Sequence, residues 1–132
     1  MIRMELADLV ATMPFAVAVG LTIDAASKDE VRGHLPWAPD RCTTAGVMHG
    51  GAVMTLADSL GAVCAFLNLP PGASTSTITS STNFLRAVRD GDLHGTARPH
   101  VGPHTIVVQT ELRDANDKVV ALVTQTQAVL VP

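Results

Sequence analysis

The sequence contains few aromatic residues and few positive charges. Among its 132 residues there are three phenylalanines, one tryptophan and no tyrosine, and the nine lysines and arginines form no cluster along the chain. Proteins that bind nucleic acids usually stack bases on aromatic side chains or neutralise phosphates with groups of Lys and Arg. With a formal net charge of −3, the composition therefore argues against a nucleic-acid partner.

Cysteine is equally scarce. Cys42 and Cys64 are the only two, which is too few for a disulfide framework, and their spacing is not that of a Cys-x-x-Cys motif. We expect both to be reduced thiols, as is usual in a cytoplasmic protein. The sequence also lacks the Gly-x-Ser-x-Gly motif of many serine hydrolases, so neither a serine nor a cysteine nucleophile is favoured.

Charge is nearly missing over one long stretch, which raises the question of a membrane span. Residues 50–69 carry a single charged side chain, that of Asp58. At the centre of a bilayer an aspartate costs roughly 2.5–3.5 kcal/mol, so a buried helix of a soluble protein is the better interpretation. Near the N-terminus, Glu5 and Pro14 interrupt the apolar stretch that follows Arg3, and we therefore expect no signal peptide.

The length and hydrophobic content of the chain predict a single domain over residues 1–132. Hydrophobic residues make up 47% of the sequence, enough for a core of its own, and there is no internal repeat or linker. Pro14 should end a first helix. We predict this first helix over residues 4–13. Two strands should follow over residues 16–25 and 30–36, and an ordered loop over residues 37–47.

A long apolar segment dominates the middle of the chain. The helix predicted over residues 49–69 ends at the Pro-Pro-Gly of residues 70–72. Its apolar side chains lie on every side, so nearly all of its faces should be buried. An antiparallel sheet must curl around such a helix to cover it, which predicts an α+β fold with one long central helix. The strands of that sheet should continue at 74–86, 93–101, 105–113 and 119–131.

This layout resembles the hotdog-fold acyl-CoA thioesterases, in particular the phenylacetate-pathway and 4-hydroxybenzoyl-CoA thioesterase group. The resemblance covers about residues 14–131 and is carried by HGGAVMTLADS at 49–59, NFLR at 83–86 and the strand–turn–strand segment at 105–130. It implies a hotdog fold and the hydrolysis of an acyl-CoA thioester to a free acid and CoA, without a metal or other cofactor. It also implies a homodimer, often a dimer of dimers and hence a homotetramer.

The resemblance further implies roles for particular residues. Asp58 would act as nucleophile or general base, and the backbone N–H of Gly50 would polarise the thioester carbonyl. His49 would support the same helix start by hydrogen bonding. Thr77, or its neighbour Ser76, would help to place the attacking water.

The sequence differs from the resembled family at two places. Relatives often carry Asn or Gln beside the thioester where this chain has Thr43. Many also carry Arg or Lys near the CoA phosphates, where this chain has Pro103 and His104. The cations best placed for those phosphates are then Arg86 and Arg89.

The residues themselves suit this chemistry. Hydrolysis of a thioester requires an attacking group and donors that stabilise an oxyanion. A helix N-terminus offers free N–H groups and partial positive charge, and Gly50 and Gly51 let a substrate approach the backbone. A carboxylate such as Asp58 in an apolar helix is a candidate base or nucleophile. The alternative is that the glycines only permit tight packing and that Asp58 is capped or lies at the surface.

The spacing of Gly50 and Asp58 predicts a site shared between two subunits. Eight residues along one helix separate them by roughly 12 Å along the axis and about 80° around it, whereas a reacting carbonyl lies about 3 Å from both donor and attacking group. A two-fold partner can bring the two together. The rival is a monomer in which another residue of the same chain joins Asp58.

Two other functions remain open. A hotdog protein can bind acyl-CoA without hydrolysing it, and turnover on any acyl-CoA distinguishes the two. A hotdog dehydratase would act through a His and acid pair in motifs that this sequence does not show. His100 and His104 have no further Cys or acid nearby, so we expect no zinc site, which needs three or four ligands.

Overall fold

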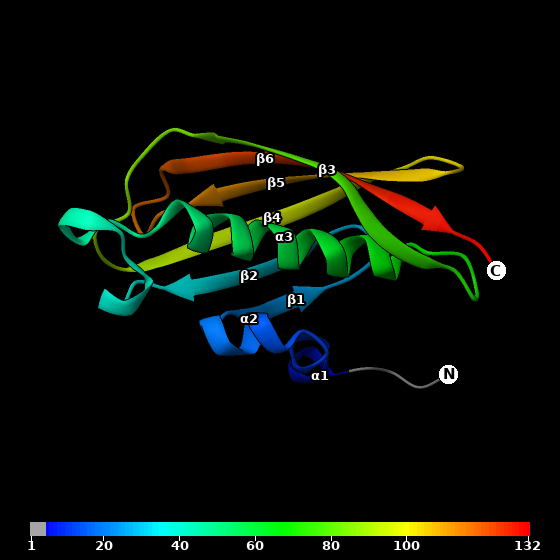
Figure 1. Ribbon diagram of the computed structural model, residues 1–132, viewed down its shortest axis with the longest axis horizontal. Coiled ribbons are helices and arrows are strands. Elements are labelled where there is room, and N and C mark those ends of the chain that lie inside the picture. Colours follow the sequence, from blue (N-terminus) through cyan, green and yellow to red (C-terminus); the bar gives the residue numbers. More distant parts are fainter. Residues whose placement is uncertain (1–4) are drawn as a thin grey trace.

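The computed structural model describes residues 5–132, so Met4, the first residue of the predicted N-terminal helix, lies outside the described part. Within it, three helices and six strands follow one another along the chain (Figure 1). They are α1 (Leu6–Ala11), α2 (Pro14–Val19), β1 (Thr22–Ala26), β2 (Val31–Pro36), α3 (Gly50–Leu67), β3 (Ser74–Phe84), β4 (Asp92–Val101), β5 (Thr105–Arg113) and β6 (Val119–Leu130). The predicted loop before α3 contains two short 3₁₀ turns, Pro39–Arg41 and Thr44–Gly46.

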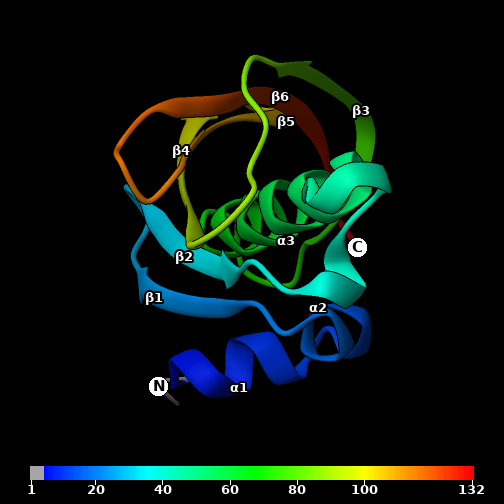
Figure 2. The same ribbon diagram turned by 90° about the vertical axis from the view of Figure 1, so that its left-hand side faces the viewer.

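The strands form one antiparallel sheet in the order β1-β2-β4-β5-β6-β3. The sheet curves around α3, which lies along its inner side, while α1 and α2 lie beyond β1 (Figure 2). This confirms the predicted α+β arrangement of a curled sheet around one long helix.

Alternation along the strands explains which face of the sheet meets α3. On β5, Ile106, Val108, Thr110 and Leu112 are buried, and the residues that alternate with them are more exposed. Since successive side chains of a strand point to opposite faces, this pattern turns one apolar face inward. The prediction of a strand over 105–113 is confirmed with the same bounds.

Two glycines let α3 approach the sheet closely. Gly33 of β2 and Gly95 of β4 lie opposite each other in the ladder. A Cβ atom at either position would come within 2.7 Å of a methyl group of Leu60. The absence of side chains at this point of the sheet therefore makes room for Leu60 and fixes the depth at which the helix packs.

The prediction of a strand over residues 16–25 is wrong for its first part. Residues 14–19 form α2, and β1 begins only at Thr22. Pro14 ends α1 but also occupies the first turn of α2, where its missing N–H is tolerated and its fixed φ suits a helix. Gly20 then caps α2 with a φ of 92°, a left-handed conformation that glycine adopts without strain.

The expectation that α3 is buried on nearly all faces is also wrong for this chain. Gly51, Met54, Asp58 and Phe66 are exposed along one side of the helix. The sheet covers only the other side of α3. It ends at β3, its edge strand, which is itself exposed over most of its length. By length and hydropathy α3 could cross a membrane, but half of it is buried here, and the core helix of a soluble protein meets the same criterion.

Candidate functional site

The start of α3 is held by His49, which caps the helix. Its Nδ1 accepts a hydrogen bond from the N–H of Gly51 at 2.8 Å, and its own N–H donates to the carbonyl of Arg41 at 2.8 Å. The carbonyl of His49 accepts from Ala52 and Val53. The N–H of Gly50 has no acceptor within residues 5–132, so it remains available at the positive end of the helix.

The NFLR segment lies against this helix start. A Cβ atom at Gly50 would come within 3.3 Å of the ring of Phe84. The N–H of Met48 donates to the carbonyl of Val88 at 2.8 Å, which joins the segment after β3 to the residue before His49. Sequence motifs far apart in the chain are therefore brought together at one end of α3.

Arg86 and Arg89, the predicted phosphate-binding cations, follow β3 in this same segment. Both are exposed, and Arg89 donates to the carbonyl of Ala45 at 3.4 Å. Thr43 is exposed in the loop before the helix, where its N–H donates to the carbonyl of Val47. These three predicted binding residues thus lie on segments that meet at the helix start.

A pocket of about 510 Å³ opens beside the helix start. His49 and Gly51 line it, together with Arg41 and apolar side chains of α2 and α3. Arg41 also donates to the carbonyls of Val19 and Pro36, so it ties the end of α2 and the end of β2 to the loop that carries His49. Arg41 was not among the residues predicted from the sequence, because its role depends on contacts between distant segments.

Asp58 lies two turns further along α3 and lines a different pocket, of about 390 Å³. Its side chain is exposed rather than buried in this chain. The other residues that line this pocket are mostly apolar or hydroxylated: Met13, Phe15, Ala16, Met54, Thr55, Ser59 and Ser80. Phe15 and Thr55 line both pockets, so the two cavities are neighbours along the exposed side of α3.

The hydroxyl residues predicted on β3, Ser76 and Thr77, do not line the pocket of Asp58 within one chain. Ser76 and Thr77 are exposed on the edge strand, and Thr77 Oγ1 accepts a hydrogen bond from Gln127 at 2.7 Å. The β3 hydroxyl that shares a pocket with Asp58 is that of Ser80. A bulge between Thr77 and Thr79 shifts the register in this part of the strand, which spacing along the sequence does not reveal.

Two fully buried glutamines on β6 were missed by the sequence analysis. Gln125 Nε2 donates to Asp58 Oδ1 at 3.4 Å, and Gln127 contacts hydroxyls of β3. A buried polar group left without a hydrogen bond costs roughly 1–3 kcal/mol, so such residues are rarely placed in a core without a reason. A signal was present, since Val123, Gln125 and Gln127 alternate on the side of the strand that should be apolar.

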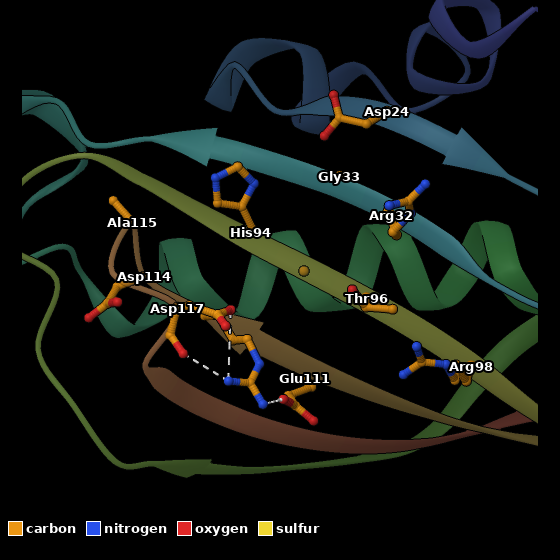
Figure 3. Close-up of a pocket in the computed structure, with 12 residues that line it drawn as sticks. Asp24, Arg32, Gly33, His94, Thr96, Arg98, Glu111, Asp114, Ala115 and Asp117 are labelled. Carbon is orange, nitrogen blue, oxygen red and sulfur yellow. Dashed lines mark hydrogen bonds and ion pairs between the residues drawn. The ribbon is translucent and has the colours of Figure 1, made fainter.

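A larger pocket, of about 690 Å³, lies on the outer face of the sheet, away from α3 (Figure 3). Several of its charged side chains are already engaged in ion pairs, some of them with Glu30 beside the pocket. Arg98 pairs with Glu30 at 2.8 Å, and Arg113 pairs with Glu111. Among the described residues, no group of three or more His, Cys, Asp and Glu side chains could hold a metal ion there or elsewhere.

Comparison with known proteins gives a consistent result. A sequence profile described as the thioesterase superfamily matches residues 45–121. A provisionally named esterase of Mycobacterium tuberculosis is 31% identical over 119 residues, 87% of this chain and 85% of that protein. The 1,4-dihydroxy-2-naphthoyl-CoA hydrolase of Escherichia coli is 30% identical over 86 residues, 64% of this chain and 63% of that enzyme.

Solved structures agree with the sequence comparisons. A thioesterase of Haemophilus influenzae superposes with a TM-score of 0.91 at 25% identity, over 98% of this chain and 93% of its own. A thioesterase of Pseudomonas aeruginosa, in mutant form, gives a TM-score of 0.90 at 25% identity, over 98% and 96%. The prediction of the hotdog fold is confirmed by these neighbours.

Proposed function

This chain belongs to the thioesterase superfamily, and we propose that it hydrolyses the thioester of an acyl-coenzyme A to a free acid and coenzyme A. The observation that carries this proposal is the pairing, on one helix, of an uncommitted N–H at Gly50 with a carboxylate at Asp58. The comparisons support a thioester hydrolase. The coenzyme A substrate and the residue roles are our inference from the site.

The N–H of Gly50 would donate a hydrogen bond to the carbonyl oxygen of the thioester. As the carbonyl carbon is attacked, negative charge moves to this oxygen, and a preorganised donor at a helix N-terminus stabilises that charge. His49 supports this donor indirectly, because its Nδ1 accepts a hydrogen bond from the N–H of Gly51 and thereby stabilises the first turn of the helix. Gly51 also has no side chain to obstruct the substrate.

Asp58 would supply the attack. As a general base it takes a proton from water, the water oxygen bonds to the carbonyl carbon, and the carbon–sulfur bond breaks. The proton then passes to the departing thiolate of coenzyme A. As a nucleophile, the carboxylate instead attacks the carbonyl carbon, the carbon–sulfur bond breaks, and the thiolate of coenzyme A leaves and takes up a proton. Water then hydrolyses the mixed anhydride to the acid and the free Asp58. A hydroxyl of β3, at Thr77, Ser76 or Ser80, would help to hold the water.

A second subunit would complete the site. Within one chain, the helix start and Asp58 line separate pockets. The exposed side of α3 and the edge strand β3 carry apolar side chains, among them Met54, Ile78 and Phe84, which are 40%, 58% and 52% exposed. A two-fold dimer that covers this surface, with its α3 helices antiparallel, would set Asp58 of one subunit beside Gly50 of the other. Further assembly into a dimer of dimers stays a prediction.

The coenzyme would be held at the same end of the molecule. Arg86 and Arg89 lie on the segment that contacts the helix start, and their guanidinium groups suit phosphate oxygens. A substrate of this kind is cytoplasmic, which agrees with the two free thiols, Cys42 and Cys64. We therefore propose the cytoplasm as the location.

A thiol-release assay tests this proposal. Purified protein is offered acyl-CoA substrates from acetyl to palmitoyl, together with phenylacetyl and hydroxybenzoyl thioesters. The name of the Escherichia coli relative is a reason to include a bicyclic aryl thioester. We expect release of CoA from at least one medium-chain or aryl substrate, undiminished in EDTA. Binding of acyl-CoA without any turnover across this panel would instead identify a non-hydrolytic binding protein.

A further inference from the structure

We propose that Gln125 is a positioning residue for this reaction, whose side-chain amide holds the Asp58 carboxylate in its reactive orientation. The inference rests on the proposed function of Asp58. It concerns a residue of β6 that is buried between the sheet and α3, and whose ladder partner Ser80 lines the pocket of Asp58.

The contact joins a buried amide to an exposed carboxylate. Gln125 is completely buried on the inner face of β6, and its Nε2 lies 3.4 Å from Asp58 Oδ1. Asp58 itself is exposed and lines a pocket. A donor fixed by the core thus restrains one carboxylate oxygen, which leaves the other free to face the pocket. An exposed aspartate without such a donor would sample several rotamers.

Gly61 makes this arrangement sterically feasible. It lies inside α3, where glycine is unfavourable relative to alanine, and a Cβ atom at this position would overlap the amide of Gln125. The helix therefore leaves a gap at Gly61, and the amide of Gln125 fills it. A helix glycine and a core glutamine are both unusual choices, and the glutamine fits here only because residue 61 has no side chain.

A second glutamine on the same strand provides the contrast. Gln127 is as deeply buried as Gln125, but both ends of its amide are satisfied. Its Nε2 donates to Thr77, and its Oε1 accepts from Thr75 at 3.2 Å. These bonds join β6 to β3 and account for Gln127 as a structural residue. The Oε1 of Gln125, in contrast, has no partner in the described part of the chain, and its Nε2 bonds to Asp58.

Fold stability alone does not explain Gln125. An apolar side chain of similar length would fill the same space without an unpartnered amide oxygen. The bond that such a change would remove is the bond to Asp58. Gln125 would thus orient a reacting side chain without touching the substrate itself. Residues in such positions often affect the rate of reaction more than substrate binding.

The test compares Gln125→Met, which keeps the length and removes the donor, with the parent enzyme. We expect kcat to fall about tenfold or more, as for the loss of one hydrogen bond to a charged group. The KM should stay nearly constant, because the substrate does not touch Gln125. The thermal midpoint should stay the same or rise. The matched control is Thr110→Val, which removes another buried and unpartnered polar atom from the inner face of the sheet and should leave kcat unchanged.

A double-mutant cycle then separates positioning from packing. In an Asp58→Asn background, Gln125→Met should cause no further loss of the residual activity, because there is no carboxylate left to orient. If Gln125 only supports the core, the variant lowers activity by the same factor in both backgrounds, and the proposal is wrong. Gln125→Asn retains the amide but shortens the side chain. It serves as the second variant if the methionine variant does not fold, and the same loss of kcat is expected.

The two proposals fail in different ways. Near-parental kcat in Asp58→Asn would overturn the proposed function and the positioning role together. A slow Asp58→Asn variant combined with a fully active, folded Gln125→Met or Gln125→Asn variant would overturn the positioning role alone.

Discussion

The two faces of the sheet differ in how completely the chain satisfies its own polar groups. On the outer face, Glu30 pairs with Arg32 and Arg98, and Arg113 pairs with Glu111. On the side of α3, the N–H of Gly50 has no acceptor within residues 5–132. The outer face holds the larger pocket, whereas Asp58 and the neighbours of Gly50 in the sequence line smaller pockets beside α3. Free hydrogen-bonding capacity, more than pocket size, is therefore the reason to propose the site beside α3.

Removing the charge of Asp58 should have the largest effect on activity. In Asp58→Asn the size of the side chain is kept, and we expect kcat to fall at least about 10²-fold, the lower end for loss of a general base. The variant should fold normally, because an amide is no harder to accommodate than a carboxylate. Steady-state kinetics and circular dichroism measure both outcomes. A folded variant with nearly parental kcat would remove Asp58 from the mechanism.

Mixing two inactive variants should restore activity if the site is shared. Asp58→Asn is combined with Gly50→Leu, whose side chain would fill the space at the helix start. After random exchange of subunits, about half of the dimers contain one of each and have one intact site, so about a quarter of the parental activity should return. Differently tagged subunits show whether exchange has taken place. Exchange without any recovery of activity would contradict a shared site.

Arginines near the start of α3 and on the outer face of the sheet should differ in their effect on substrate binding. Arg86→Ala or Arg89→Ala should raise KM for an acyl-CoA about tenfold, the effect of one lost contact between charged groups, with a smaller effect on kcat. Arg98→Ala is the matched control on the outer face and should change neither constant. If Arg86→Ala and Arg89→Ala behave like the control, both are solvated surface residues without a role in binding.

The smallest effect concerns the two thiols. Burial raises the pKa of Cys64 to about 11, so at pH 8 it stays a protonated and unreactive thiol, whereas Cys42 is only half-buried. We expect iodoacetamide to modify at most Cys42 in the folded protein at pH 8, and both cysteines in denaturant, as measured by intact mass. Labelling of Cys64 should increase only as the pH rises towards 11. Rapid labelling of Cys64 at pH 8 would show that the interior opens readily.

Much of the fold was predictable because its pattern is local. The alternation over 105–113, the polar turn that follows it and the Pro-Pro-Gly after the long helix gave strand and helix positions within a few residues. Residues 16–19 were the main error, since short apolar runs suit a helix or a strand equally well. In this case Pro14 favoured a helix by starting one.

The candidate site was predictable in its motifs but not in its supporting contacts. His49, Gly50 and Asp58 stand out in the sequence, because charge and glycine are unusual in an apolar helix. Arg41 and Gln125 act through segments that are distant along the chain, at Val19 and Asp58 respectively. No local pattern records such contacts.

The composition of the edge strand β3 has a consequence for the newly synthesised chain, because it affects the tendency of that chain to aggregate. Edge strands are usually protected from pairing with other proteins by lysine, proline or inward charges, but Ser74–Phe84 contains no proline and no charged residue. Every free chain therefore presents an unprotected template for strand addition. In the proposed dimer a second copy would cover this edge, so assembly of the dimer would compete with aggregation of the free chains.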